Sequence, residues 1–224
     1  MEENILQQKE KVFVSWSGGK DAYLALQLAQ EQGLEVGCLL NFQSENGQSR
    51  SHGLSQDILC QQAALLGIPL EGEAVSWGTY EKGFDRAVER LKYRGFTGGV
   101  FGDINLEEHR QWIEKKCQEN NVKSYLPLWG MKERRVTEEF LQREGRALLV
   151  SLKNELVSEN WLGKIISPRF LDYCESRGLS PCGERGEFHT LVIDGAGFHS
   201  SLKYRIDRVE REKGLTRLLI SLRS

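Results

Sequence analysis

The chain has 224 residues, of which 39% are hydrophobic and 28% are charged, and its formal net charge is −2 at pH 7. This length allows one large domain or two small ones, and the composition is that of a globular protein with a sizeable core. The near-neutral charge argues against a long nucleic acid as a partner, and no apolar run approaches the roughly 20 residues that a membrane-spanning helix requires.

Strands and helices alternate in the first part of the chain. Apolar runs predict strands at residues 12–16, 35–42, 74–77, 99–104 and 122–126. Helical spacing of apolar residues and glycine stops predict helices at residues 21–32, 56–66, 80–94 and 107–119. Several strand–helix units in a row predict an α/β fold, with a Rossmann-like parallel sheet covered by helices on both faces.

The pattern changes after about residue 130. Helices are predicted at residues 137–143 and 168–176, and strands at residues 190–194, 202–206 and 216–222. These last strands have no helices between them, which predicts antiparallel pairing. We therefore expect a nucleotide-binding domain at residues 1–130 and a smaller α+β substrate-recognition domain at residues 131–224.

A short turn joins the first strand to the first helix in the sequence VSWSGGKDAYLAL, residues 14–26. Its glycines permit positive φ and close approach of backbone N–H groups to a ligand, and the helix adds its positive N-terminal end. A lysine adds a cation, so the turn predicts a phosphate site made of Ser15, Ser17, Gly18, Gly19, Lys20 and Asp21. The turn matches neither the GxxxxGK loop nor the GxGxxG pattern.

Two carboxylates lie three residues apart in a second glycine-rich turn. Glu184 and Glu187 flank Gly186. Such a pair can ligate Mg²⁺, act as a base toward an amine or bind a cationic substrate. The structural alternative is a tight loop that leads into the next strand.

Other candidate residues each have a structural alternative. Asp103 follows a predicted strand and can bind a metal or a ribose, or cap the next helix. His52 can contact a phosphate or remain a solvated loop residue, and Arg110 can neutralise phosphate or remain a surface charge. Trp129 and Trp161 can stack on a base or form the wall of a substrate cleft, although an isolated tryptophan more often belongs to a core or an interface.

The segment SGGKDA, residues 17–22, resembles the SGGxDS pyrophosphate loop (PP-loop) of the N-type ATP pyrophosphatases. Those enzymes split ATP between the α and β phosphates and transfer the adenylyl group. The resemblance implies that residues 17–21 hold the leaving pyrophosphate and that Asp21 helps to position Mg²⁺. Ala22 stands where the family has its last serine, which removes one hydroxyl contact to phosphate.

Two C-terminal segments resemble one particular family of these enzymes. SENWLGKIIS (residues 158–167) and PCGERGEFHTLVIDG (residues 181–195) resemble the motifs ESWLGR and NPCGEGGEYETLVLD of the diphthine–ammonia ligase family, also called diphthamide synthetases. FGDI (residues 101–104) and PLWG (residues 127–130) are similar to further family features. On this basis we predict additional ATP contacts at His52, Gly102 and Asp103, and substrate contacts at Trp129, Trp161, Gly183, Glu184, Gly186, Glu187 and His189.

The resemblance implies an ATP-dependent, amide-forming ligase. A substrate carboxylate attacks the α-phosphorus of ATP, and free ammonia then displaces AMP from the acyl-adenylate. The expected catalytic residues are Lys20, Asp21, Glu184 and Glu187, with ATP and Mg²⁺ as cofactors and with ammonia and a carboxylate acceptor as partners. Arg185 and His189 stand where the family has a glycine and a glutamate. They make the site more basic and bulkier, so the acceptor can differ from the diphthine of elongation factor 2.

Two other functions also remain open. A tRNA-modifying sulfur transferase uses a similar loop and needs a reactive cysteine, for which Cys182 is the candidate. A non-catalytic adenine-nucleotide-binding protein is compatible with Ala22. The lack of a CxxC pair and of a basic surface argues against the first function, and the Glu184 and Glu187 pair argues against the second.

The five cysteines are scattered and form no CxxC pair, which is typical of reduced thiols. The first 11 residues contain no apolar signal-peptide stretch. We therefore expect a cytoplasmic protein without a membrane partner, and a homo-oligomer is compatible with the sequence.

Overall fold

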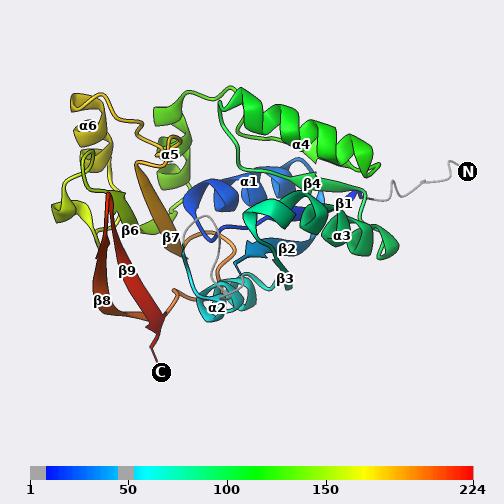
Figure 1. Ribbon diagram of the computed structural model, residues 1–224, viewed down its shortest axis with the longest axis horizontal. Helices are drawn as coiled ribbons and strands as arrows, with labels where there is room; N and C mark the ends of the chain where they lie inside the picture. Colours follow the sequence, from blue (N-terminus) through cyan, green and yellow to red (C-terminus); the bar gives the residue numbers. More distant parts are fainter. Residues whose placement is uncertain (1–8, 45–52, 224) are drawn as a thin grey trace, which may run out of the picture.

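The structure, a computed structural model, describes residues 9–44 and 53–223 and contains two separate β-sheets. Figure 1 shows a parallel sheet with its helices on one side of the molecule and an antiparallel sheet on the other. The sheets are built from consecutive parts of the chain.

The first sheet is parallel, with strand order β3-β2-β1-β4-β5. Its strands are β1 (Lys11–Ser15), β2 (Glu35–Gln43), β3 (Leu70–Ala74), β4 (Gly98–Val100) and β5 (Lys123–Tyr125). Successive side chains of β1 enter different cores, because strand residues alternate between the two faces of a sheet. Val12 and Val14 belong to the largest core and Phe13 to a second core. Both faces of the sheet are therefore buried.

Four helices cover these two faces: α1 (Lys20–Glu31), α2 (Gln56–Leu66), α3 (Tyr80–Tyr93) and α4 (Glu107–Glu119). Residues of α1 and α2 pack in the largest core, whereas residues of α3 and α4 pack in the second core. This arrangement confirms the predicted α/β fold with helices on both faces of a parallel sheet.

The second sheet is antiparallel, with strand order β7-β6-β9-β8. Its strands are β6 (Arg146–Lys153), β7 (Phe188–Asp194), β8 (Tyr204–Glu212) and β9 (Leu215–Leu222). Two helices, α5 (Glu133–Gln142) and α6 (Pro168–Ser176), and a short 3-10 turn, η2 (Glu159–Trp161), complete this part. The predicted smaller α+β region is confirmed.

Several strand predictions were wrong in their bounds, and one strand was missed. β3 lies before the predicted strand at residues 74–77, where a 3-10 turn, η1 (Trp77–Thr79), begins instead. β3 has the sequence LEGEA, with glycine and charged residues that do not favour strands. β8 extends to residue 212, well beyond the predicted 202–206, because exposed edge strands tolerate charged residues. Finally, β4 stops at Val100, and β6 was not predicted at all.

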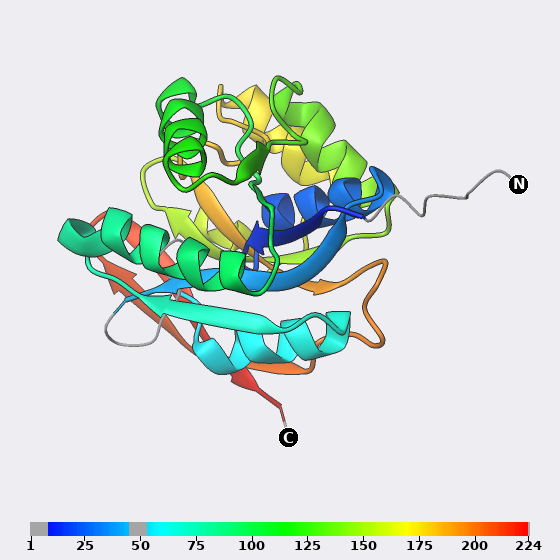
Figure 2. The same cartoon turned by 90° about the vertical axis from the view of Figure 1, so that its right-hand side faces the viewer.

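The largest hydrophobic core contains residues from both halves of the chain. Val14, Leu24 and Leu39 from the first half share it with Leu148 and Leu191 from the second. Helix α1 lies between the parallel sheet and the C-terminal elements, where it contacts α5 and β7 (Figures 1 and 2). The division into domains at residue 130 therefore stays a proposal, because the two parts share one core.

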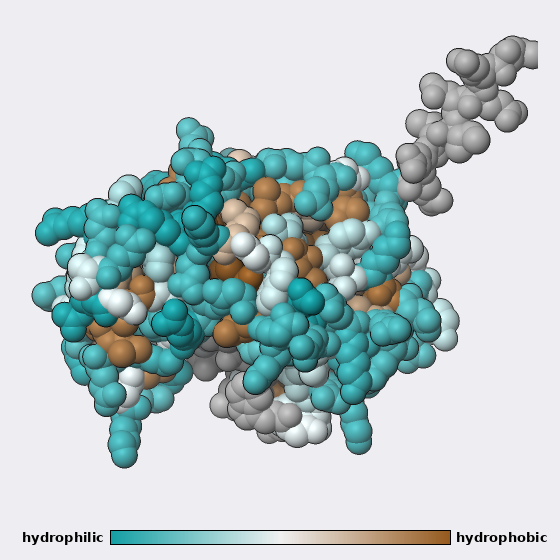
Figure 3. All heavy atoms as spheres, turned by 90° about the horizontal axis from the view of Figure 1, so that it is seen from above, coloured by the Kyte–Doolittle hydropathy of each residue, from teal (hydrophilic) through white to brown (hydrophobic). Residues whose placement is uncertain are grey.

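Figure 3 shows one face of the molecule, seen from above relative to Figure 1. This face is mostly hydrophilic, and its hydrophobic residues lie mainly toward the middle, between hydrophilic margins. Within the described residues, no helix is long and apolar enough to cross a membrane.

Candidate active site

The glycine turn between β1 and α1 requires a glycine at its first position. Gly18 has φ +82°, and a Cβ atom there would lie 2.7 Å from Leu59 Cδ2 and 2.8 Å from Gln62 Oε1. Gly19 is the N-cap of α1, and its N–H is bonded to Ser17 Oγ at 3.3 Å. The turn is thus packed closely against α2, and α1 begins directly after it.

A strand of the second sheet holds this turn in place. Val192 N donates to Gly18 O at 2.9 Å, and Lys20 N donates to Thr190 Oγ1 at 3.1 Å. Gln62 adds a bridge, because its Nε2 donates to Gly18 O at 3.0 Å and to Val192 O at 2.6 Å. The turn and β7 therefore form one hydrogen-bonded unit, although more than 160 residues separate them in the chain.

The lysine of the turn is buried, with 1% of its surface exposed. Its Nζ donates to both carboxylate oxygens of Asp21, at 2.7 and 2.9 Å, and to the carbonyl oxygen of Cys182. The Phe188 ring centroid lies 5.6 Å away. Burial alone would lower the pKa of Lys20, but the Asp21 carboxylate, the Cys182 thiol and the Glu184 carboxylate together outweigh this desolvation, and the pKa is raised. Lys20 is therefore a charged ammonium group in a buried position.

A cavity of about 170 Å³ opens beside Lys20. We call it the Lys20 cavity; its lining residues are Lys20, Asp21, Cys182, Gly183, Glu184, Gly186, Phe188, His189 and Thr190. The two glycine-rich turns identified in the sequence thus meet at one place. Such a convergence of charged groups from separate elements is typical of an active site.

Glu184 links the second glycine-rich turn to the loop after β4. Its Oε1 accepts from Ile104 N and Asn105 N, each at 3.3 Å. Burial raises the pKa of Glu184, and the nearby carboxylates of Asp21 and Asp103 raise it further, while the two backbone N–H groups oppose the shift. A carboxylate with a raised pKa is a better proton acceptor than an ordinary glutamate.

Glu187 has different surroundings. It is 2% exposed, and its two oxygens accept from Ser180 N and Arg185 N, each at 3.0 Å. Gly183 and Gly186 have φ of +76° and +73°, so this loop needs its glycines. The carboxylate shapes the loop, and it is not among the described residues that line the Lys20 cavity.

The loop after β4 packs against the start of α1. A Cβ atom at Gly102 would lie 2.9 Å from the carbonyl carbon of Asp21 and 3.0 Å from Ala22 N. Asp103 Oδ1 lies 3.2 Å from His109 Nδ1, and this contact raises the pKa of His109. The N-cap of α4 is Leu106, so the helix-capping interpretation of Asp103 was wrong.

The two predicted tryptophans lie apart from the Lys20 cavity. Trp129 stacks with Arg110, whose guanidinium carbon is 5.0 Å from the ring centroid. Arg110 pairs with Glu107 and Glu114 on its own helix, so it forms part of a surface ion-pair network. Trp161 lines a second cavity. His52 lies outside the described residues.

Cys182 is a poor candidate for a nucleophile. It is 2% exposed, and burial raises the pKa of its thiol to about 12. A thiol with this pKa is protonated at neutral pH, and the thiolate is the reactive form. This observation weighs against the sulfur-transfer alternative.

Sequence reasoning missed three residues that organise the site. Thr190, Gln62 and Phe188 contact the glycine turn or its lysine. Gln62 lies within an ordinary helix and carried no motif, whereas Thr190 and Phe188 stood inside a recognised segment without an assigned role. Among residues 9–44 and 53–223, no group of three or more His, Cys, Asp or Glu side chains is arranged to hold a metal ion.

Comparison with known proteins identifies related sequences along most of the chain. Residues 10–124 match the family model of the diphthamide synthase N-terminal domain, and residues 132–221 match that of the diphthamide synthase C-terminal domain. The diphthine–ammonia ligase of Schizosaccharomyces pombe is 24% identical over 207 residues, which cover 82% of this chain and 34% of that protein. This chain thus spans about a third of the length of the yeast protein.

Two further comparisons gave matches to this chain, one with a sequence and one with a solved structure. The diphthine–ammonia ligase of Mus musculus is 22% identical over 80% of this chain and 76% of its own length. A crystal structure described as a predicted subunit of a tRNA methyltransferase from Methanocaldococcus jannaschii is 15% identical. The match covers 86% of this chain and 100% of that chain with a TM-score of 0.40, which is too low to inform the fold or the function.

Proposed function

The chain belongs to the diphthamide synthase family, and we propose that it is an ATP-dependent ligase that adenylates a substrate carboxylate and transfers ammonia to it. Relatives at 22–24% identity carry the name diphthine–ammonia ligase, which supports a ligase of this kind. The observation that carries the proposal is the buried Lys20 ammonium, which faces one cavity together with Asp21 and Glu184.

In the adenylation step, a carboxylate oxygen of the acceptor attacks the α-phosphorus of ATP, and the bond to the bridging oxygen of pyrophosphate breaks. Negative charge then develops on the departing pyrophosphate. Lys20 and the N-terminal end of α1 stabilise this charge, because both attract a developing anion. For this role Lys20 exchanges its bond to the Cys182 carbonyl for a phosphate oxygen. The proposed ATP contacts are Ser15, Ser17, Gly18, Gly19, Lys20, Asp21, Gly102 and Asp103.

The residues beside Lys20 also fit Mg²⁺. The side chain of Asp21 is 29% exposed, and Mg²⁺ is commonly held by one or two carboxylates together with substrate phosphates. Asp21 would hold the ion, which would neutralise charge on the phosphates. The pairing of Asp21 with Lys20 keeps the carboxylate oriented at the edge of the cavity.

In the amidation step, the ammonia nitrogen attacks the carbonyl carbon of the acyl-adenylate, and AMP leaves. Glu184 accepts the proton that the nitrogen loses, which suits a carboxylate whose pKa is raised. Glu187 supports this step by shaping the loop that carries Glu184.

The proposed acceptor is a carboxylate, either diphthine on a protein or a different acid. Arg185 is exposed and lies 3.7 Å from Glu133, whereas His189 lines the Lys20 cavity. Both residues replace smaller or acidic residues of the family motif, which favours a different or more acidic acceptor. A cytoplasmic location and a homo-oligomer remain part of the proposal.

Product analysis tests this function directly. With ATP, ammonium and candidate acids, we expect AMP and pyrophosphate rather than ADP and phosphate. The Lys20→Met variant should lower AMP formation by roughly 100-fold or more, because the leaving group loses its cation.

Lys116→Met is the matched control for folding. Lys116 is also buried, with 7% exposed, and its Nζ donates to Asp85 and Glu119 at 2.9 Å. Both variants should lose about 1–3 kcal/mol of stability, but Lys116→Met should retain AMP formation. ADP as product, or equal activity in the two variants, would reject the proposal.

A further inference from the structure

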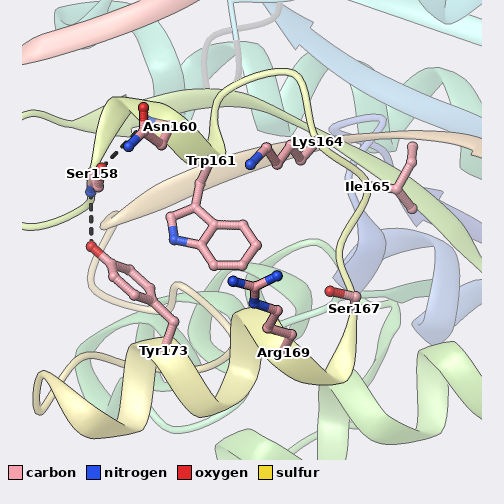
Figure 4. A pocket seen from close by; sticks show the side chains of 8 residues that line it. All are labelled: Ser158, Asn160, Trp161, Lys164, Ile165, Ser167, Arg169 and Tyr173. Atoms are coloured by element: carbon pink, nitrogen blue, oxygen red, sulfur yellow. Dashed lines mark hydrogen bonds between the residues drawn. The ribbon is translucent and has the colours of Figure 1, made fainter.

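A second cavity, of about 520 Å³, lies in the C-terminal part of the molecule (Figure 4). We call it the Trp161 cavity; it is lined by Ser158, Asn160, Trp161, Lys164, Ile165, Ser167, Arg169 and Tyr173. These residues come from the segment around η2 and from α6. Its volume is typical of sites for small organic ligands, and it shares no lining residue with the Lys20 cavity.

Trp161 provides a fixed aromatic surface in this cavity. Its ring centroid lies 5.0 Å from that of Phe170 and 5.3 Å from that of Tyr173, with the ring planes tilted by 63° and 48°. The Tyr173 hydroxyl accepts from Ser158 N at 2.9 Å, which ties η2 to α6 (Figure 4). The indole thus packs against two other aromatic rings, yet it remains only partly buried.

Two cations line this cavity without a carboxylate partner among the described residues. Lys164 Nζ lies 5.3 Å from the Trp161 centroid, and Arg169 on α6 lines the same cavity (Figure 4). Within the described part of the chain, neither Lys164 nor Arg169 lies within 4.0 Å of a carboxylate, although most arginines of this protein do. The lining includes no acidic residue. The cavity therefore combines an aromatic surface with uncompensated positive charge.

We propose that the Trp161 cavity is a second ligand site that binds a planar organic anion, namely a carboxylate or phosphate attached to an aromatic or heteroaromatic ring. The ring of the ligand packs against Trp161, and its anionic group lies between Lys164 and Arg169. Ser158, Asn160 and Ser167 supply neutral polar groups at the margin. This inference does not depend on the proposed ligase activity, because the two cavities have separate linings.

The test uses the full chain without ATP and follows the indole N–H signals by heteronuclear NMR. The protein has five tryptophans, and the Trp161→Phe variant identifies the signal of Trp161. Benzoate and phenyl phosphate are the probes, and they distinguish a carboxylate from a phosphate ligand. We expect one or both to shift the Trp161 signal, with a dissociation constant on the order of 1 mM. Benzamide, acetate and inorganic phosphate should cause much smaller shifts, because each lacks either the charge or the ring.

Arg169→Gln should weaken binding of the better probe by roughly tenfold, since one charge-assisted hydrogen bond is lost. Arg177→Gln is the matched control: Arg177 is the exposed C-cap residue of the same helix and its guanidinium carbon lies 5.8 Å from the Tyr173 centroid, but it does not line the cavity. Lys164→Gln provides a second, independent variant. The proposal is overturned if no probe shifts the Trp161 signal, if benzamide binds as well as benzoate, or if Arg169→Gln and Arg177→Gln behave alike.

Discussion

Glu184 and Glu187 lie three residues apart in one loop, yet their carboxylates have different surroundings. Glu187 is buried and accepts two backbone N–H groups of its own loop. Glu184 accepts from the loop after β4 and lies near two other carboxylates. The first therefore stabilises a local conformation, whereas the second has the raised pKa that suits proton transfer.

The raised pKa of Glu184 has a consequence for stability. The folded protein holds this proton more tightly than the unfolded chain, so the contribution of Glu184 to the free energy of unfolding falls as pH rises through its folded pKa. The stability of Glu184→Gln relative to that of the original protein should therefore be higher at about pH 8 than at about pH 5. Urea unfolding at both pH values measures this difference, with the exposed Glu155→Gln as control. If Glu184→Gln instead lowered the stability more at the higher pH than at the lower pH, the raised pKa of Glu184 would be contradicted.

Gly18 and Gly33 provide a matched pair for testing the glycine turn. Their φ angles are +82° and +84°, but a Cβ at Gly33 would meet no atom within 4 Å, whereas one at Gly18 would meet Leu59 at 2.7 Å. Gly33→Ala should cost about 1 kcal/mol, from backbone strain alone, and Gly18→Ala about 2–5 kcal/mol. Thermal unfolding measures both values, and equal costs would show that the turn is not closely packed.

At the scale of elements, the N-terminal end of α1 is positioned by α2 and β7. Gln62 on α2 is fully buried and donates to carbonyl groups of the glycine turn and of β7. Its Oε1 also accepts from Trp16 Nε1 at 3.2 Å. One side chain therefore joins three segments around the site.

Gln62→Leu should destabilise the protein by roughly 3 kcal/mol, because it leaves buried polar groups without partners. It should also raise the KM for ATP more than it lowers kcat, since the turn loses an anchor while the reacting groups remain. Gln61→Leu on the same helix is the control and should change stability by less than about 0.5 kcal/mol. An unchanged KM in Gln62→Leu would limit this residue to a structural role.

At the scale of the whole molecule, the two sheets share one hydrophobic core. Residues of the C-terminal part in this core are Val136, Phe140, Ala147, Leu148, Val150, Cys182, Leu191, Val192, Ile193, Leu202 and Leu218. Elements α5 and β7 of this part contact α1, which is buried along most of its length. Removal of the C-terminal part would expose this helix to water.

A fragment of residues 1–130 should therefore not fold into a stable, uniquely packed monomer. We expect helical far-UV circular dichroism, weak near-UV signals and binding of a hydrophobic dye, which are features of a molten globule. A cooperative unfolding transition in this fragment would instead support two independent domains.

The sequence by itself determined the fold class and most helices. The predictions for α2, α4 and α6 are confirmed in full, because their ends carry local signals such as Gly67 as C-cap and Pro168 in the first turn. Strand β6 carried no such signal: six consecutive buried residues give it no polar alternation.

Only the tertiary structure decided which residues meet at the candidate site. The sequence marked Lys20 and Glu184 in separate motifs, but the pairing of Lys20 with the Cys182 carbonyl and the bridge through Gln62 depend on how α1 packs against β7. Glycine turns and helix caps follow from the few residues around them, so a sequence reveals them. Contacts across a shared core depend on the packing of distant segments, which local patterns do not encode.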